Sequence, residues 1–491
     1  MRKRRTLITT ALLVLVGAPA LVRAQADDFS AIRAQVCFDR PLRAWDGFGV
    51  NYVEVPQTVD YDADPQEYGG FSLLTEAQRQ MICDLIFGDD GLQPDLVKMF
   101  HDPWHQARPD GPFDHERTTR WMRYFVREGL QRTRARGQDL TIITTLYGPP
   151  PWATKQRFLR GRDLDPARKE DLAEYLIDWV RFLREQEGLP VKYISLHNEG
   201  EDWRRWPADG ASGNIGKGHD YNLFWPPEQV VDFLTFMRPM MDRAGLQEVG
   251  LTPGETSNWF RFHAWGYAQA IADDAQALAH LGLITSHGFY SGNYGRWFGD
   301  HRSVGIDLLR EKRPDLRAWV TSTSWSRMDC RNLFEMYGNI YSAKVNGVIP
   351  WAAVQRPAKW VGGDPNPGCA IRIHEDGHYE VLRGYYYYKQ ICGAGQAGMA
   401  VAQTACMDSE AAVIAFASNG TPHPDAFILV NIASEPRRFA VHLSGTPASH
   451  FVAWRTTDAK DRYAPLGTMD VEDRVLRYEA PAQSATTFFA R

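Results

Sequence analysis

The chain contains 491 residues, of which 44% are hydrophobic, so it is long and apolar enough for one large domain and a second, smaller one. Its 55 basic side chains against 60 acidic ones give a net charge of −5, without the basic surplus that nucleic-acid binding requires. Aromatic residues make up 12% of the chain and include 16 tryptophans, which suit a packed core and an aromatic-lined ligand groove equally well.

The first 24 residues have the composition of a secretory signal peptide. A basic head at Arg2–Arg5 precedes an apolar run from Leu7 to Leu21, and the small residue Ala24 provides a cleavage site. Five of the 55 basic residues lie in this segment, so the remaining chain carries 50 basic against 60 acidic side chains. No later apolar run reaches the roughly 18 residues of a membrane-spanning helix. We therefore expect a secreted or periplasmic monomer that contacts neither a membrane nor nucleic acid.

Six cysteines lie beyond the signal segment. An even number in an exported chain permits up to three disulfide bonds. Their wide spacing does not resemble a zinc-binding pattern, and the histidines are scattered, so we expect no metal site and no cofactor. The six are Cys37, Cys83, Cys330, Cys369, Cys392 and Cys406.

Between residues 44 and 392, short apolar runs alternate with amphipathic segments. Residues 75–87 and 167–186 carry apolar side chains at the i, i+3, i+4 and i+7 positions of a helix. Eight strands that alternate with helices over this length predict a (β/α)8 TIM barrel, with a doubly wound parallel sheet as the alternative. The strands are expected at 45–53, 95–100, 140–147, 191–198, 248–253, 283–290, 317–323 and 345–352.

The pattern changes after residue 392. Short apolar strands separated by Gly, Pro, Asn and Ser predict an all-β sandwich domain over residues 393–491. The N-terminal segment 25–43 contains the stretch AQVCFDR, whose period does not belong to the barrel, and we expect it to add a strand to the β-domain. The strands of this domain are expected at 411–418, 426–433, 437–445, 450–457 and 484–491.

Polar and aromatic side chains follow all eight strands of the predicted barrel. Catalytic groups in such barrels come from the carboxyl ends of the strands, so these side chains should meet at one mouth. The mouth suits a carbohydrate, because rings can stack on sugars, amides and imidazoles can bind hydroxyl groups, and carboxylates can transfer protons. The predicted substrate-binding residues are Asn51, Asp102, Tyr147, Trp152, Asn198, His287, Tyr290, Trp297, Trp325 and Trp351.

The stretch KYISLHNEGEDW (192–203) ends its strand in Asn198 and Glu199. Glu199 is placed to act as the general acid that protonates a departing glycosidic oxygen, and Asn198 can bind the sugar hydroxyl beside the reacting carbon. The alternative is a strand that simply ends in two soluble residues. The similar side chains at the other seven strand ends favour the catalytic interpretation.

Five stretches of the chain resemble glycoside hydrolase family 30, and most closely its branch related to endo-β-1,6-galactanases. They are WDGFGVNYVE, LIFGDDGLQPDLVKMF, LTIITTLYGPPPWATK, ISLHNEG and VNGVIPWA. The resemblance covers nearly the whole chain beyond the signal segment. It implies a clan-A barrel with a β-sandwich beside it, a β-linked and galactan-like substrate, and Glu199 as the acid/base.

The chain departs from this family at the seventh strand. The family carries its nucleophilic glutamate there, in a pattern like Trp-x-Thr-Glu, whereas the stretch WVTSTSW puts Ser322 in the nucleophile slot. No carboxylate occurs from Arg317 to Met328. A retaining glycosidase needs a carboxylate about 5–5.5 Å from the acid, and an ether formed on serine would not turn over easily.

Three interpretations of this departure are open. A carboxylate from another strand end can complete the catalytic pair, with Glu255 favoured, and a separation of about 6.5–9.5 Å would then predict inversion. The barrel can instead have lost hydrolysis and act as a glycan-binding protein. The loop after strand seven can also bring Asp329 into the slot. Glu255 itself can be a solvated acid or a partner of Arg261. The weaker candidates for the second carboxylate are Asp102, Glu201, Asp202 and Asp329.

Overall fold

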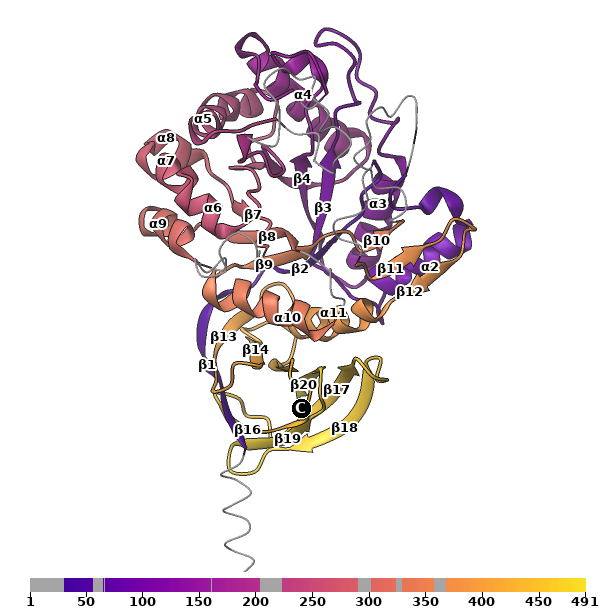
Figure 1. Cartoon of the computed structure of the whole chain (residues 1–491), viewed down its shortest axis with the longest axis vertical. Helices are drawn as coiled ribbons and strands as arrows, with labels where there is room; N and C mark the ends of the chain where they lie inside the picture. The colour runs from indigo at the N-terminus through magenta and orange to yellow at the C-terminus, as the bar shows by residue number, and fades with distance from the viewer. Residues whose placement is uncertain are drawn as a thin grey trace, which may run out of the picture.

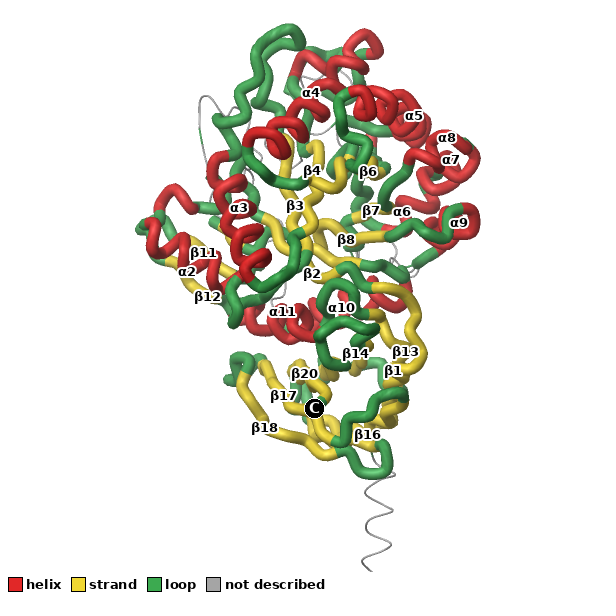
Figure 2. The backbone as a smooth tube through the Cα atoms, turned by 180° about the vertical axis from the view of Figure 1, so that it is seen from behind, coloured by secondary structure: helices red, strands yellow, loops and turns green. Residues whose placement is uncertain are grey.

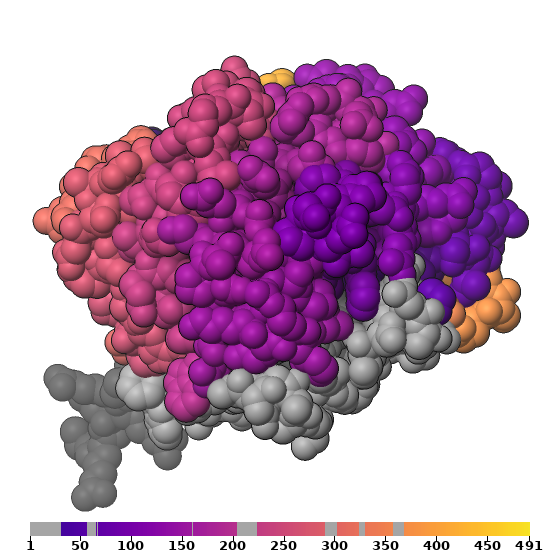
Figure 3. Space-filling view, turned by 90° about the horizontal axis from the view of Figure 1, so that it is seen from above, coloured from indigo at the N-terminus to yellow at the C-terminus, as the bar shows by residue number. Residues whose placement is uncertain are grey.

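The computed structural model describes residues 31–55, 65, 67–159, 161–203, 223–289, 302–323, 329–356 and 368–491. Figure 1 shows a barrel of strands and helices above an all-β domain. Seen from the side opposite the β-domain, barrel residues coloured indigo to pink form nearly all of the described surface (Figure 3). The expected signal peptide and the predicted site residues Tyr290, Trp297 and Trp325 lie outside the described residues.

Eight parallel strands form the barrel, in the order β6-β5-β4-β3-β2-β9-β8-β7. Bridges from Leu251 to Leu281 and from Thr256 to Ser286 join the two ends of this sheet, so the barrel closes. Closure excludes the doubly wound sheet and confirms the predicted (β/α)8 fold. The strands are β2 (Gly47–Asn51), β3 (Leu96–His101), β4 (Thr141–Leu146), β5 (Val191–Ser195), β6 (Gly250–Thr252), β7 (Ile284–Ser286), β8 (Ala318–Thr323) and β9 (Gly347–Pro350).

Helices surround the barrel strands, as the view from behind shows (Figure 2). Helix α2 (Glu76–Phe87) begins with a capping box between Thr75 and Gln78 and turns its apolar face, including Ile82 and Ile86, into the core. The other helices are α3 (Arg120–Ala135), α4 (Lys169–Arg181), α5 (Pro227–Arg243), α6 (Trp259–Ala264), α7 (Tyr267–Asp273), α8 (Ala275–His280), α9 (Val304–Lys312), α10 (Cys330–Tyr337) and α11 (Arg383–Ala394).

Nine strands form the sheet of the β-domain, in the order β18-β17-β20-β15-β14-β13-β1-β16-β19. Strand β1 (Ile32–Ala44), the first along the chain, pairs antiparallel with β13 and parallel with β16, so the N-terminal segment lies inside this sheet. The sheet encloses its own apolar core, which includes Val36, Phe427 and Phe488. The remaining strands are β13 (Ala400–Cys406), β14 (Ala411–Ala417), β15 (Ala426–Asn431), β16 (Arg437–Ser444), β17 (His450–Thr457), β18 (Ala464–Asp470), β19 (Val475–Ala480) and β20 (Ser484–Ala490).

Helix α11 connects the barrel to the β-domain. Its tyrosines Tyr385, Tyr387 and Tyr388 are buried, as expected of an aromatic helix in a core. Gln390 lies between the helix and the sheet, where it donates to Thr456 at 2.9 Å and accepts from Thr487 at 2.6 Å. The helix runs to Ala394, so the expected domain boundary after residue 392 falls inside its last turn.

Several short strands were not expected from the sequence. Besides β13, β18 and β19, the structure contains a small sheet of β10 (Val354–Gln355), β11 (Ile371–Ile373) and β12 (Tyr379–Val381). Strand β18 lies at the edge of its sheet, contains Pro465 and Gly467, and has no fully buried residue. It therefore lacks the apolar pattern by which a strand is recognised.

No helix in the described ranges has both the length and the apolar character needed to cross a membrane. Cys37, Cys83, Cys330, Cys392 and Cys406 carry free thiols. The disulfide bonds that six cysteines permit are therefore not formed among these five residues.

Candidate functional site

Three side chains from the carboxyl ends of neighbouring strands meet at the mouth of the barrel. Glu199 follows β5, Glu255 follows β6 and His287 follows β7. The His287 ring lies between the two carboxylates, with Nδ1 2.8 Å from Oε1 of Glu199 and Nε2 3.1 Å from Oε2 of Glu255. The structure thus joins three residues that were predicted separately into one hydrogen-bonded group.

The backbone holds Glu199 in the left-handed region, at φ +53°. Its N–H donates to the carbonyl of Glu255 at 2.8 Å, and the N–H of Glu255 donates to the carbonyl of His197 at 2.8 Å. These bonds continue the pairing of β5 with β6 beyond the last residue of either strand and fix the direction of the Glu199 side chain. Such strain in a residue other than glycine costs about 1–3 kcal/mol and is concentrated at functional sites.

Glu255 is buried against a lysine from the barrel interior. Nζ of Lys98, on β3, lies 2.5 Å from Oε2 of Glu255, and the hydroxyl of Thr145, on β4, donates to Oε1 at 2.7 Å. Burial works to raise the pKa of Glu255, but the charge of Lys98 and the hydrogen bond of His287 outweigh it and lower the pKa to about 2. Glu255 is therefore a carboxylate at neutral pH, and neither it nor Lys98 is exposed to solvent.

His287 binds a proton more readily than an ordinary histidine. Burial works against the charged ring, but the hydrogen bonds to Glu199 and Glu255 outweigh burial and raise the pKa of His287. The protonated ring donates from Nδ1 to Glu199 and from Nε2 to Glu255. Of the two carboxylates, Glu199 is the one that solvent reaches, because its side chain is 14% exposed and that of Glu255 is not exposed at all.

His197 lies beneath this group as a buried, neutral residue. Its Nδ1 accepts a hydrogen bond from the N–H of Gly200 at 3.1 Å, its ring stacks on Trp225, and burial lowers its pKa to about 4. Gly254 (φ +92°) passes so close that a Cβ there would lie 2.0 Å from the ring of His197. The turn that carries Glu255 therefore requires glycine at this position.

Ser322 occupies the end of β8, where the resemblance places a nucleophilic glutamate. Its side chain is buried, and within the part of the chain that the structure describes its Oγ has no hydrogen-bond partner. A buried hydroxyl of this kind can bind a water molecule where further polar groups face the same space.

The other acids near the mouth have structural partners. Glu201 forms a buried ion pair with Arg261 at 2.8 Å and accepts a hydrogen bond from Ser257. Arg261 is thus the partner of Glu201, and the interpretation that pairs it with Glu255 is wrong, because Glu255 binds Lys98 instead.

Two further carboxylates stabilise local backbone. Asp329 caps α10 by accepting from the N–H of Arg331 at 2.8 Å, and Asp102 accepts from the N–H of Trp104 at 2.9 Å. Asp202 is also buried. Among the described residues, no three His, Cys, Asp or Glu side chains come together as metal ligands.

The predicted aromatic binding residues that the structure describes are buried. Trp152 and Trp351 are 8% and 7% exposed, and Tyr147 is 1% exposed. The indole N–H of Trp152 donates to the carbonyl of Gln106 at 3.0 Å, which fixes the ring in the wall of the barrel. Asn51 and Asn198 are buried as well. The roles of these residues in sugar binding stay predictions.

Three residues of the site region were missing from the sequence-based prediction. Lys98 and Thr145 contact Glu255 from inside the barrel, and Trp203 is 55% exposed four residues after Glu199. A lysine in the middle of an apolar strand was the available signal for Lys98, since a buried cation requires a partner. Trp203 offers the flat exposed ring that Trp152 and Trp351 do not.

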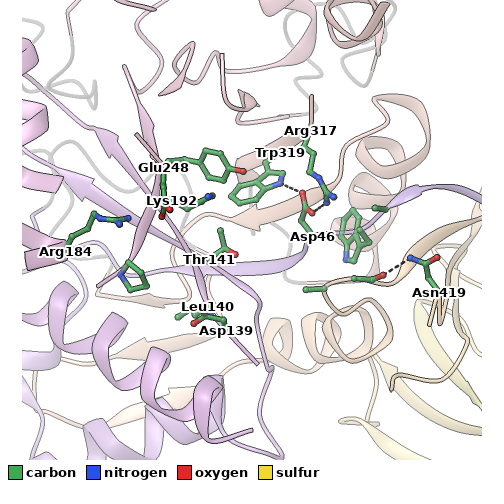
Figure 4. A pocket seen from close by; sticks show the side chains of 16 residues that line it. Asp46, Asp139, Leu140, Thr141, Arg184, Lys192, Glu248, Arg317, Trp319 and Asn419 are labelled. Carbon is green, nitrogen blue, oxygen red and sulfur yellow. Dashed lines mark hydrogen bonds and ion pairs between the residues drawn. The ribbon is translucent and has the colours of Figure 1, made fainter. Parts of the chain in front are cut away.

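A pocket of about 730 Å³ opens at the opposite end of the barrel (Figure 4). Asp46, Lys192 and Arg317, which line it, stand before or at the start of their strands, away from Glu199. Asp46 accepts from the indole N–H of Trp319 at 2.8 Å and pairs with Arg317. This end of such barrels serves stability, so we assign no catalysis to it.

No protein-family model matches the chain, and no curated protein matches it either. Among solved structures, a GH30 endoxylanase from Clostridium papyrosolvens C71 is 15% identical, with a TM-score of 0.67 over 94% of this chain and 100% of the enzyme. The catalytic domain of GH30 xylanase C from Talaromyces cellulolyticus is 15% identical, with a TM-score of 0.68 over 94% of this chain and 100% of that one. An endo-β1,6-glucanase is 16% identical, with a TM-score of 0.68 over 94% of each chain. At these identities the likeness shows a shared fold, a (β/α)8 barrel with an attached β-domain.

Proposed function

We propose that this protein is a glycoside hydrolase that cleaves a β-linked glycan, with Glu199 as the general acid. One observation carries the proposal: the Glu199 carboxylate is held by strained backbone at the mouth of the barrel, is partly exposed, and lies 2.8 Å from Nδ1 of His287. A general acid must come within hydrogen-bond reach of the departing oxygen, which a side chain at the carboxyl end of a barrel strand can do. The shared fold with GH30 xylanases and an endo-β1,6-glucanase supports this proposal.

We propose a galactan-like polysaccharide or oligosaccharide as the substrate. The support is the likeness of the sequence motifs to the endo-β-1,6-galactanase branch of family 30. The structural relatives are named for activity on xylan and on β1,6-glucan, so both polymers belong in any substrate panel.

In our proposal, the second catalytic group is a water molecule rather than the nucleophilic glutamate of the family. The motif resemblance places Ser322 where the family carries its nucleophile, and Glu255 is fully buried with its oxygens bound to Lys98, Thr145 and His287. We propose that a water molecule bound by the Ser322 hydroxyl attacks the sugar carbon and releases its proton to solvent, while Glu199 protonates the departing oxygen. Attack by water without a covalent intermediate inverts the anomeric carbon, which proton NMR of the first-formed anomer measures.

A second function, glycan binding without hydrolysis, is favoured by the same two residues. Ser322 is not a carboxylate, and the charge of Glu255 is balanced by Lys98. Of the two carboxylates that bind His287, only Glu199 is exposed to solvent. A barrel of this kind could retain its sugar-binding mouth after losing turnover.

The deciding experiment compares the wild type with Glu199→Gln on β-1,6-galactan, β-1,3-galactan, xylan and β-1,6-glucan. We expect the variant to lose hydrolysis by about 100-fold or more while binding the same polymer, because the amide keeps the shape of the carboxyl group but donates no acid proton. Glu311→Gln, at an exposed position of α9, is the matched control. Binding of one polymer without hydrolysis by the wild type would establish the second function, and neither binding nor hydrolysis would contradict both.

We further propose that the protein is exported and that residues 1–24 are removed. The basic head, the apolar run and Ala24 support this. The first residue of the protein recovered from the periplasm or medium should then be Gln25, which N-terminal sequencing determines.

A further inference from the structure

Lys98, Glu255, His287 and Glu199 form a line of alternating charge across the barrel mouth. Successive atoms are 2.5 Å apart from Lys98 Nζ to Glu255 Oε2, 3.1 Å from there to His287 Nε2, and 2.8 Å from His287 Nδ1 to Glu199 Oε1. The exposed fraction of the side chains rises along this line, from 0% for Lys98 and Glu255 to 4% for His287 and 14% for Glu199. The line therefore runs from a fixed buried charge to the group that meets solvent.

Glu255 determines which nitrogen of His287 carries a permanent hydrogen. Lys98 keeps Glu255 ionised, and an ionised carboxylate only accepts hydrogen bonds. Nε2 of His287 therefore bears hydrogen in both protonation states of the ring. The proton that the ring gains or loses sits on Nδ1, the nitrogen that faces Glu199.

We propose that His287 is a positioning residue that stores the acid proton on Nδ1 and passes it to Glu199 during cleavage of the glycosidic bond. This inference rests on the proposed function. In the step, the Nδ1–H bond breaks as an O–H bond forms on Glu199, and Glu199 then protonates the departing oxygen, which keeps the electron pair of the broken C–O bond. Water adds to the sugar carbon and releases its proton to solvent, and a proton from solvent reaches Nδ1 through Glu199, the exposed member of the line, and restores the charged ring.

The described surroundings of His287 hold few groups that can take this proton. Among the described residues, the charged and titratable groups that act on the ring include Glu199, Glu255, Lys98 and His197. His197 stays neutral, because burial lowers its pKa to about 4. The ring of Phe289 closes one side, at 5.3 Å between ring centroids.

Nitrogen NMR of the full chain, labelled with 15N-histidine, tests the place of the proton without any substrate. We expect Nε2 of His287 to stay protonated across the whole titration while Nδ1 loses its proton as the pH rises. Glu199→Gln should lower the pKa of His287, because the ring then loses one of its two carboxylate partners. Finding Nε2 without hydrogen at alkaline pH, or an unchanged pKa in Glu199→Gln, would overturn the inference.

Kinetics of His287→Gln test the transfer itself. The variant should lose about 100-fold in kcat on the polysaccharide but less than about 10-fold on a 2,4-dinitrophenyl glycoside of the same sugar, whose leaving group needs no proton. The wild type should show an alkaline limb in its pH profile, and the variant should lose it. His450→Gln, on the outer face of the β-domain, is the matched control. Equal losses on both substrates would show a merely structural role and overturn the inference. If the wild type hydrolyses nothing, the proposed function fails, while the NMR titration still decides where the proton resides.

Discussion

Lys98 and Glu255 form an ion pair from which solvent is excluded. Taking two charges out of water costs several kcal/mol each, and close contact recovers this only when further hydrogen bonds satisfy the remaining atoms. Thr145 and His287 provide those bonds to Glu255. The stability of the barrel should therefore depend on this pair far more than on any ion pair at the surface.

The first prediction concerns Lys98→Met. The variant leaves the Glu255 carboxylate buried without its cation, so we expect the free energy of unfolding at pH 7 to fall by about 3–5 kcal/mol, measured with urea. Lys169→Met is the matched control: Lys169 pairs with Asp232 where both side chains are partly exposed, and the expected loss is about 0–1 kcal/mol. Similar losses in the two variants would contradict this account of the buried pair.

The pH dependence of stability gives a second prediction at the same pair. The pKa of Glu255 lies near 2 in the folded protein, below its ordinary value of 4.5, so its contribution to stability is present above pH 4.5 and is lost as the pH falls toward 2. Lys98→Met should lack this contribution. Urea unfolding at several pH values would then show a weaker acid dependence for the variant than for the wild type, and equal slopes would argue against the assignment.

Ser322→Glu is the third prediction. The substitution places a carboxylate where the family resemblance expects a nucleophile, so we expect retaining hydrolysis to appear or to increase by at least about 10-fold, with the stereochemistry read by proton NMR. Ser322→Gln adds the same length without the charge and should show no such gain. A gain in both variants would indicate a change of shape rather than a restored nucleophile.

At the scale of residues, the line of alternating charge from Lys98 to Glu199 is predicted better at its exposed end than at its buried end. Glu199, Glu255 and His287 were found because each directly follows an apolar strand, where barrel chemistry is expected. Lys98 and Thr145 lie inside their strands, and only the closed barrel brings them to Glu255. The near-complete burial of Trp152 and Trp351 was not foreseen either, because sequence position at a strand end does not determine which way a ring packs.

At the scale of elements, the turn after β6 fits closely against β5. Gly254 lies against the ring of His197, and the next residue, Glu255, bonds through its backbone to both His197 and Glu199. The position of the Glu255 carboxylate therefore depends on the absence of a side chain one residue earlier.

Gly254→Ala is the fourth prediction. Its Cβ would lie 2.0 Å from the His197 ring in a backbone conformation at φ +92°, so we expect a loss of stability of about 2–4 kcal/mol by thermal or urea unfolding. Gly188→Ala is the matched control, because Gly188 also has a positive φ, +67°, but nothing within 4 Å of an added Cβ, and should cost about 1 kcal/mol. An equal cost at both sites would mean that the packing against His197 is unimportant.

All eight barrel strands lie where the sequence predicts them, because a parallel strand that is buried on both faces reads as a short continuous apolar run. The strands that were missed have other compositions. Strand β18 is exposed along most of its length, and β10–β12 are two or three residues long. Such strands are held by backbone pairing with their neighbours rather than by an apolar pattern of their own.

At the scale of the whole molecule, β1 binds the two ends of the chain together. It lies between β13 and β16 in the sheet of the β-domain. This sheet is therefore complete only with a strand that precedes the barrel in the sequence, whereas the other strands of the sheet follow the barrel. The sequence predicted that this segment joins the β-domain, but its place inside the sheet could not be predicted, since strand order depends on pairings between distant residues.

The fifth prediction follows from this place. The fragment 393–491 lacks β1 and should not unfold cooperatively, because β13 and β16 lose their shared neighbour. The control is the same fragment with Ile32–Ala44 attached through a flexible linker, which should regain a cooperative transition by circular dichroism. Cooperative unfolding of the fragment without β1 would contradict the prediction.

The position of β1 also determines the order of events during synthesis. The ribosome makes this strand before the barrel, yet both of its partners emerge only after the entire barrel has been translated. Until then the backbone groups of β1 that pair with these strands are unsatisfied, which favours aggregation. Chaperones that hold nascent chains during translation should therefore raise the yield of this protein more than that of a barrel whose first strand pairs with the second.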